Sequence, residues 1–176
     1  MLAVAACSNE PAVDGTTSST TSGASATTTT VPPDPTTTTT SLIGVSTEFS
    51  RAVVELDGSP LTVAVADTND ERVRGLMGVE ALSPLDGMLF VFENSTIRSF
   101  WMKDTLIPLD IAFFDEDGFL VSQTTMPVCP EDDCPRYSSE APARYALEAP
   151  AGSLSGLAGD ARLVIIGALD GSGKEI

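Results

Sequence analysis

Residues 109–125 read LDIAFFDEDGFLVSQTT and contain the strongest hairpin signal of the chain. Two apolar runs, Leu109–Phe114 and Phe119–Thr125, flank the turn cluster Asp115–Gly118. Acidic residues followed by glycine suit the backbone of a tight turn, and apolar runs bounded in this way are typical of strands. The stretch therefore predicts two antiparallel strands joined by a short loop.

The same succession of apolar runs and turn clusters extends in both directions from this hairpin. Upstream, Arg51–Leu56 and Leu61–Ala66 are separated by the turn cluster Asp57–Pro60, which predicts an opening hairpin. Thr68–Glu71 has the pattern of a capping box, so we expect a short helix that ends near Gly78. Further strands are expected at Gly87–Phe92, Ile97–Met102, Arg144–Glu148 and Arg162–Gly167, with a small helical turn around Ser153–Leu157.

These elements predict one mainly β domain of the α+β class over residues 42–171. Seven or eight short strands in about 130 residues favour a compact, largely antiparallel sheet curled toward a barrel. We expect one or two short helices to cover an opening or an edge of that sheet. Residues 172–176 are expected to be a C-terminal tail.

Residues 8–41 have a different composition from the rest of the chain. Between Thr16 and Ser41, 18 of 26 residues are Thr or Ser, and the only charged residue is Asp34. Such a stretch cannot bury enough apolar surface to offset the ordering of its backbone. We therefore expect a disordered Thr/Ser/Pro-rich tether.

The start of the chain suggests what this tether is attached to. The apolar run Leu2–Ala6 ends at Cys7 and resembles a bacterial lipoprotein signal, in which the cysteine thiol is acylated. Only six residues precede Cys7, so we expect residues 1–7 to be the remnant of a longer signal. The resemblance implies a lipid anchor at Cys7 that holds the protein on the extracytoplasmic side of the cell membrane. The alternative is a frayed terminus with an incidental thiol.

Two further cysteines, Cys129 and Cys134, form an even pair if Cys7 is lipidated. In an exported protein such a pair predicts a disulfide, which would close a short local loop. The alternative is a soft metal ion held by the two thiolates, which the intervening acidic residues would not select. We expect a disulfide, no metal and no cofactor.

Composition excludes several classes of function. The chain of 176 residues has 25 acidic and 9 basic side chains, a formal net charge of −16, and no histidine. Nucleic-acid binding is not expected, because it requires clustered cations. The lack of histidine removes imidazole acid–base catalysis and Ser-His-Asp triads. We expect a monomer.

Four blocks of sequence carry a resemblance to a known family: Arg74–Gly78, Gly87–Phe90, Phe100–Ile111 and Tyr145–Glu148. Over Val53–Gly167 the chain resembles family 192 of the domains of unknown function. Cys129, Cys134 and Tyr137 fall where that family often has a Pro-Cys loop followed by tyrosine. The resemblance implies a small, mainly β domain of bacterial exported or anchored proteins, and it implies neither an activity nor a cofactor. Asp104 stands where the family pattern usually has asparagine.

The central block suggests a ligand-binding surface. If Phe100–Lys103 is extended, Trp101 and Lys103 face the same side, because side chains alternate along a strand. An indole beside an ammonium group can stack on a ring while the cation holds an anionic group. Arg74, on the expected helix with Arg72, can bind a carboxylate or phosphate. Equally, these arginines can cap the last turn of that helix, where cations are favoured. The alternative is that Trp101 packs in the core and Lys103 pairs with a nearby aspartate.

Two carboxylates give a second hypothesis. Asp110 interrupts an apolar run and therefore needs a partner, for which Lys103 and Arg74 are candidates. Asp110 and Glu148 would serve as catalytic residues of a hydrolase or transferase acting on envelope polymers if they faced each other across a cleft. We favour the first hypothesis, a noncatalytic envelope module that binds a small ligand, a cell-wall glycan or a protein partner through Arg74, Trp101 and Lys103.

Overall fold

The computed structural model describes residues 49–130 and 133–169, which belong to a unit running from Thr40 to Ile176. The expected signal remnant (1–7), tether (8–41) and C-terminal tail (172–176) lie outside the described residues. Within the described part of the chain, none of the helical structure is long and apolar enough to span a membrane.

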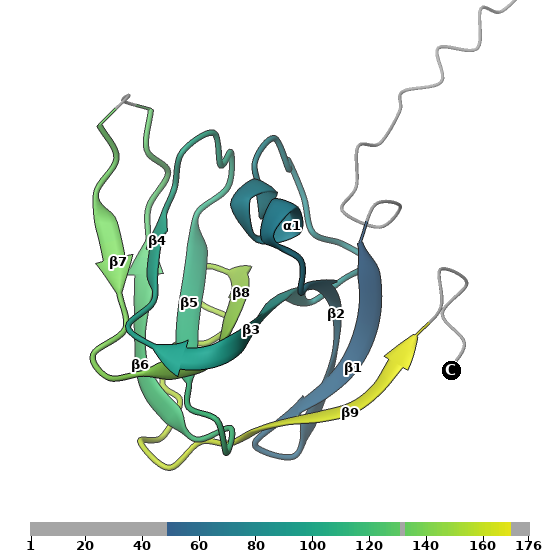
Figure 1. Ribbon diagram of the computed structural model, residues 1–176. Helices are drawn as coiled ribbons and strands as arrows, with labels where there is room; N and C mark the ends of the chain where they lie inside the picture. The colour runs from purple at the N-terminus through teal and green to yellow at the C-terminus, as the bar shows by residue number, and fades with distance from the viewer. Residues whose placement is uncertain (1–48, 131–132, 170–176) are drawn as a thin grey trace, which may run out of the picture. The chain divides into compact units, whose positions relative to one another are not determined.

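Nine strands and one short helix make up the described part of the chain (Figure 1). In chain order they are β1 (Ser50–Leu56), β2 (Ser59–Ala66), α1 (Asn69–Arg74), β3 (Gly87–Thr96), β4 (Ser99–Trp101), β5 (Leu109–Phe114), β6 (Leu120–Met126), β7 (Arg136–Ser138), β8 (Ala143–Pro150) and β9 (Leu163–Leu169). The predicted mainly β class with a short helix is confirmed. The sequence did not predict β7.

Seven strands form one mixed sheet in the order β6-β5-β8-β3-β2-β1-β9, and β4 pairs with β7 in a separate two-stranded sheet. The predicted hairpins β1–β2 and β5–β6 are both antiparallel. Strands β2 and β3 are parallel, because residues 67–86, which include α1, carry the chain back to the end of the sheet where β2 began.

The large sheet curls until its two ends nearly meet, without closing into a barrel. An isolated antiparallel bridge joins Phe119, before β6, to Arg162, before β9. The Leu163 N–H donates to the Gly118 carbonyl at 2.8 Å. Gly118 has a φ of 84°, and a Cβ at this position would collide with the Leu163 carbonyl, so this contact requires glycine.

Two apolar cores lie on opposite faces of the sheet. Met88 and Phe90 of β3 belong to the first core, whereas Leu89 between them belongs to the second. This division follows from the alternation of side chains along a strand. The first core also contains Leu76, which follows α1, and Met102, which follows β4. The segment containing α1 and the β4 segment therefore pack on one face of the sheet.

The helix α1 begins at the predicted capping box. The Thr68 hydroxyl accepts from the Glu71 N–H at 3.3 Å, and the Glu71 carboxylate accepts from the Thr68 N–H at 3.0 Å. The helix ends at Arg74, before the predicted end, because Gly75 adopts a φ of 47°. The helical turn expected at 153–157 is wrong, since these residues form only turns and bends.

Candidate functional site

Trp101 ends β4 at the surface of the protein. It is 37% exposed, so it is not a core residue. Its register partner in β7 is Arg136, whose guanidinium carbon lies 4.5 Å from the centroid of the indole ring. The Lys103 Nζ, in the turn after β4, lies 5.9 Å from the same ring. Trp101 therefore has two cations beside it, of which the sequence indicated one.

A second aromatic ring, Phe92 of β3, also carries two cations. The guanidinium carbons of Arg98 and Arg72 lie 3.9 Å and 5.3 Å from its centroid. Backbone carbonyls hold both groups: Arg98 Nε donates to Ala143 at 3.1 Å, and Arg72 Nη1 donates to Val91 at 2.9 Å. Burial lowers the pKa of Arg98, and the charge of Arg72 lowers it further. The two cations thus repel each other.

These side chains line a groove between α1 and strands β3 and β4. The outer part of this groove has a volume of about 380 Å³. The inner part has a volume of about 30 Å³ and shares several wall residues with the outer part. We call the two parts together the basic groove. Its outer walls include Arg72, Phe92, Arg98, Trp101 and Arg136, and its inner walls add Arg74, Lys103, Thr105 and Glu148.

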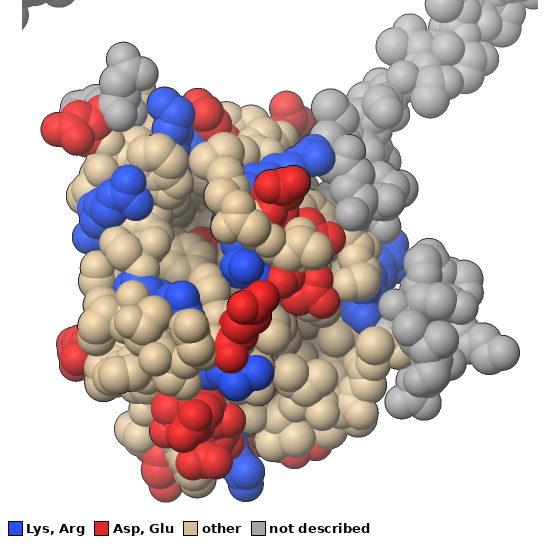
Figure 2. Space-filling view, viewed as in Figure 1, with Lys and Arg blue, Asp and Glu red and all other residues tan. Residues whose placement is uncertain are grey.

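The charge of the basic groove is opposite to that of the whole protein. Five of the nine cationic side chains line it, although the net charge is −16. Four of them, Arg72, Arg98, Lys103 and Arg136, have no acidic partner among the residues that the structure describes. Figure 2 shows Lys and Arg side chains on the face that carries α1, β4 and β7. A bound anion would relieve the repulsion among these cations.

Glu148 of β8 lies at the inner end of the basic groove. It is 4% exposed, and its register partners Met88 and Ile111 belong to the first core. Within residues 49–130 and 133–169 its carboxyl group has no hydrogen-bond or ion-pair partner. Burial raises the pKa of Glu148 to about 8. At neutral pH it is therefore mainly an uncharged acid, which can both donate and accept hydrogen bonds.

Asp110 is also buried, but hydrogen bonds from the protein satisfy its carboxylate. One carboxylate oxygen accepts from the Thr125 hydroxyl at 2.6 Å. The other accepts from the backbone N–H groups of Gly152 at 2.8 Å and Leu154 at 3.0 Å. The expected cationic partner of Asp110 is thus wrong, because backbone and hydroxyl donors satisfy both oxygens. Asp110 fixes the turn that follows β8.

Asp110 and Glu148 do not face each other. Asp110 pairs with Ala149 of β8, whose side chain lies in the second core, whereas Glu148 pairs with Ile111, which lies in the first. Side chains at neighbouring positions of a strand point to opposite faces. The hypothesis of two carboxylates that converge in a cleft is therefore wrong. In the described ranges no group of three or more His, Cys, Asp or Glu is placed to hold a metal ion.

The structure joins Cys129 and Cys134 by a disulfide in the segment between β6 and β7. Arg136, which contacts Trp101, follows two residues later. Asp104, in the turn beside Lys103, has a φ of 54°, a conformation that Asn and Asp adopt more readily than most residues. Asp104 therefore suits this turn as well as the asparagine that the resemblance implies.

The sequence did not indicate Arg98, Arg136 or Phe92. Arg136 reaches Trp101 through the pairing of two three-residue strands that lie far apart in the chain. Arg98 stacks on Phe92 across the end of β3. Neither contact leaves a periodic signal.

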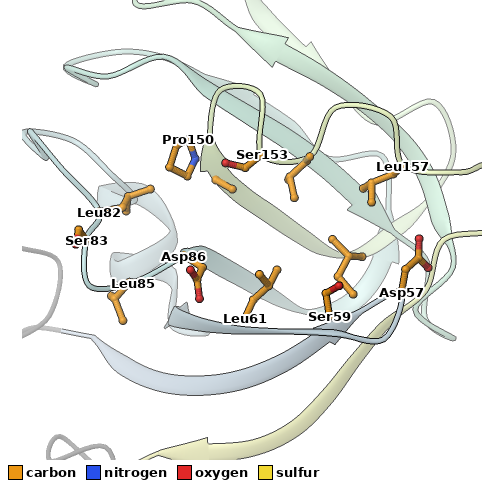
Figure 3. A pocket seen from close by; sticks show the side chains of 13 residues that line it. Asp57, Ser59, Leu61, Leu82, Ser83, Leu85, Asp86, Pro150, Ser153 and Leu157 are labelled. Carbon is orange, nitrogen blue, oxygen red and sulfur yellow. The ribbon is translucent and has the colours of Figure 1, made fainter.

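A second cavity, of about 440 Å³, lies elsewhere and contains none of the predicted site residues (Figure 3). Its two acids each accept a hydrogen bond from a backbone N–H, at 2.7 Å for Asp86 and 3.0 Å for Asp57. Its apolar walls are mainly leucines, among them Leu61, Leu82, Leu85 and Leu157. Since these acids already have partners, this cavity offers less specific chemistry than the basic groove.

Comparisons with known proteins find one family and similar solved structures. The family model DUF192, described as Uncharacterized ACR, matches residues 52–165. A Sinorhizobium meliloti 1021 protein described as a candidate transcription regulator is 30% identical, with a TM-score of 0.58 over 68% of this chain and 95% of that one. A Novosphingobium aromaticivorans DSM 12444 protein of unknown function is 25% identical, with a TM-score of 0.57 over 65% and 84%. No curated protein matches the chain.

Proposed function

The chain belongs to the DUF192 family, and from that premise we propose that its domain is a noncatalytic module that binds a small organic anion in the basic groove. One observation carries this proposal. Arg72, Arg98, Lys103 and Arg136 converge on two aromatic rings and have no acidic partner in the described part of a strongly acidic chain.

The dimensions and the walls of the basic groove favour a small ligand. Its outer volume of about 380 Å³ lies at the lower end of the range for small-molecule sites. The exposed part of Trp101 can pack on the apolar face of a ring, while Lys103 and Arg136 beside it bind a carboxylate or phosphate group. A ligand with one anionic group and a compact ring matches both features.

The sequence did not indicate the cluster of cations in the basic groove. Nucleic acid is nevertheless a less suitable ligand than a small anion. The remaining surface is acidic overall, which opposes contact with a long polyanion.

The cellular setting is part of the proposal. We propose that the domain works on the extracytoplasmic side of the cell membrane, anchored through an acylated Cys7 and held away from the membrane by residues 8–41. The disulfide between Cys129 and Cys134 supports this setting, because disulfides persist mainly in oxidising compartments.

A fluorescence titration tests the proposed groove directly, because Trp101 is the only tryptophan of the protein. Cyclohexanecarboxylate, a ring with one carboxylate, should cause a saturable change in emission. Lys103→Gln and Arg136→Gln should each weaken its affinity by about fivefold, the effect of losing one charged contact.

Arg162→Gln is the matched control for this titration. Arg162 also lies over an aromatic ring, Phe119, at 5.2 Å, and its loss changes the net charge equally, but it does not line the basic groove. The affinity of this variant should equal that of the wild type. A wild-type protein that shows no saturable change, or a control that weakens binding as much as Arg136→Gln, would contradict the proposal.

A further inference from the structure

The inner part of the basic groove holds a buried acid whose presence the fold itself does not explain. Glu148 occupies a position in β8 where its neighbours on the same face, Met88 and Ile111, are apolar. It is 4% exposed and has no partner among the described residues. Burial of a polar group without a hydrogen bond destabilises a protein, so a methionine or leucine would serve the core better.

The volume in front of Glu148 limits what can reach it. The inner cavity measures about 30 Å³, against about 380 Å³ for the outer part of the groove, so it accommodates only a small part of a ligand. A single hydroxyl group fits this space.

The charges around the inner cavity also limit the chemistry of that group. Arg72 and Arg74 face the cavity from α1, and Lys103 faces it from the turn after β4. Its other polar side chain is Thr105, whose hydroxyl donates to the Lys103 carbonyl at 3.4 Å. Three neighbouring cations disfavour a ligand ammonium group. An uncharged hydrogen-bonding group is the best match to an uncharged acid.

We propose that Glu148 makes the basic groove selective for hydroxylated organic anions, such as sugar acids, by hydrogen bonding to one ligand hydroxyl inside the inner cavity. This inference rests on the proposed function and specifies its ligand class. The anionic group binds the rim cations, the ring packs on Trp101, and the hydroxyl group gives the Glu148 carboxyl the hydrogen bond that the protein does not supply.

Two carboxylate probes can distinguish recognition of a hydroxyl group from anion binding alone. They differ only in their hydroxyl groups and in one ring atom, which is oxygen in glucuronate and carbon in cyclohexanecarboxylate. Glucuronate and cyclohexanecarboxylate each place one carboxylate on a six-membered ring, but only glucuronate carries hydroxyl groups. Calorimetric titration of the wild type should give about tenfold tighter binding of glucuronate, because a site built to bind a hydroxyl discriminates against a ligand that lacks it.

Two substitutions of Glu148 then identify the residue responsible. Glu148→Met has nearly the same size but makes no such hydrogen bond, and it should bind both probes equally. Glu148→Gln keeps the ability to donate and accept, and it should retain most of the preference for glucuronate. Lys103→Gln is the matched control. It should lower the affinity for both probes by the same factor, so the ratio of the two affinities should stay unchanged.

The possible outcomes are distinct. Equal binding of both probes by the wild type, or a preference that survives in Glu148→Met, overturns this inference and leaves anion binding in place. If neither probe binds to the wild type, the proposed function fails and this inference fails with it. Loss of the preference in Glu148→Met, with retention in Glu148→Gln, supports the inference.

Discussion

At the scale of single residues, the two buried carboxylates have opposite roles. Asp110 accepts three hydrogen bonds and holds the turn after β8, whereas Glu148 accepts none within the described residues and faces the basic groove. Buried ionisable groups that lack a structural partner and line a cleft are candidates for function. Glu148 meets this description and Asp110 does not.

Glu148 should make the stability of the protein depend on pH. Its pKa is raised from 4.5 to about 8 in the folded state, so between these values the folded protein binds a proton that the unfolded chain has lost. The free energy of unfolding should therefore fall as pH rises through this window, by up to about 1.4 kcal/mol per pH unit. Urea denaturation of the wild type and Glu148→Gln at several pH values measures this effect.

Glu148→Gln should lose that dependence and gain stability relative to the wild type as pH rises. A stability difference between the two proteins that stays constant from about pH 5 to about pH 8 would show that Glu148 does not titrate in this range.

Asp110→Ala should destabilise the protein without affecting the basic groove. The substitution leaves the N–H groups of Gly152 and Leu154 without their acceptor, and we expect a loss of about 3 kcal/mol, since hydrogen bonds to charged groups contribute most. Urea denaturation gives the loss in free energy of unfolding, and titration with cyclohexanecarboxylate should give an unchanged affinity. A variant of wild-type stability would disprove the structural role of Asp110.

At the scale of elements, the sequence predicted those features that depend on neighbouring residues. The Asp115–Gly118 turn and the Thr68–Glu71 capping box each act within a few residues, and both are present. The parallel pair β2–β3 and the pairing of β4 with β7 depend on segments that meet only in the folded chain. For that reason Trp101 and Lys103 could be proposed from the sequence, whereas Arg136 could not.

The disulfide should support the basic groove through β7. It closes a short loop that ends two residues before Arg136, and such a loop contributes about 2 kcal/mol through the entropy of the unfolded chain. We expect the double variant Cys129→Ser and Cys134→Ser to lose about that much stability and several-fold in affinity for cyclohexanecarboxylate. Urea denaturation and Trp101 fluorescence measure the two effects. Affinity equal to that of the wild type would show that β7 does not depend on the disulfide.

At the scale of the whole molecule, the distribution of charge is the main feature that composition could not reveal. A net charge of −16 predicts repulsion of anions, yet five of nine cations line one groove. An acidic surface around a basic site disfavours long polyanions while leaving the site open to small ones. The sequence provided the total charge, and only the fold determined where the cations gather.

The proposed anchor is tested on the whole protein in its native cells. The wild type should be recovered with membranes, and Cys7→Ser should be recovered in the soluble fraction, because a polypeptide without acyl chains has no membrane attachment of this kind. Immunodetection after cell fractionation measures the distribution. Retention of Cys7→Ser with the membranes would exclude lipidation of Cys7 as the anchor.

The central claim is that a small organic anion binds in the basic groove, and nuclear magnetic resonance of the isotope-labelled protein titrated with glucuronate tests it most directly. We predict that the largest shifts fall on the Trp101 indole N–H and on the amides around Arg72, Lys103 and Arg136. Shifts concentrated instead at the leucine-lined cavity around Leu61 and Leu157, or a spectrum that glucuronate leaves unchanged, would contradict the claim.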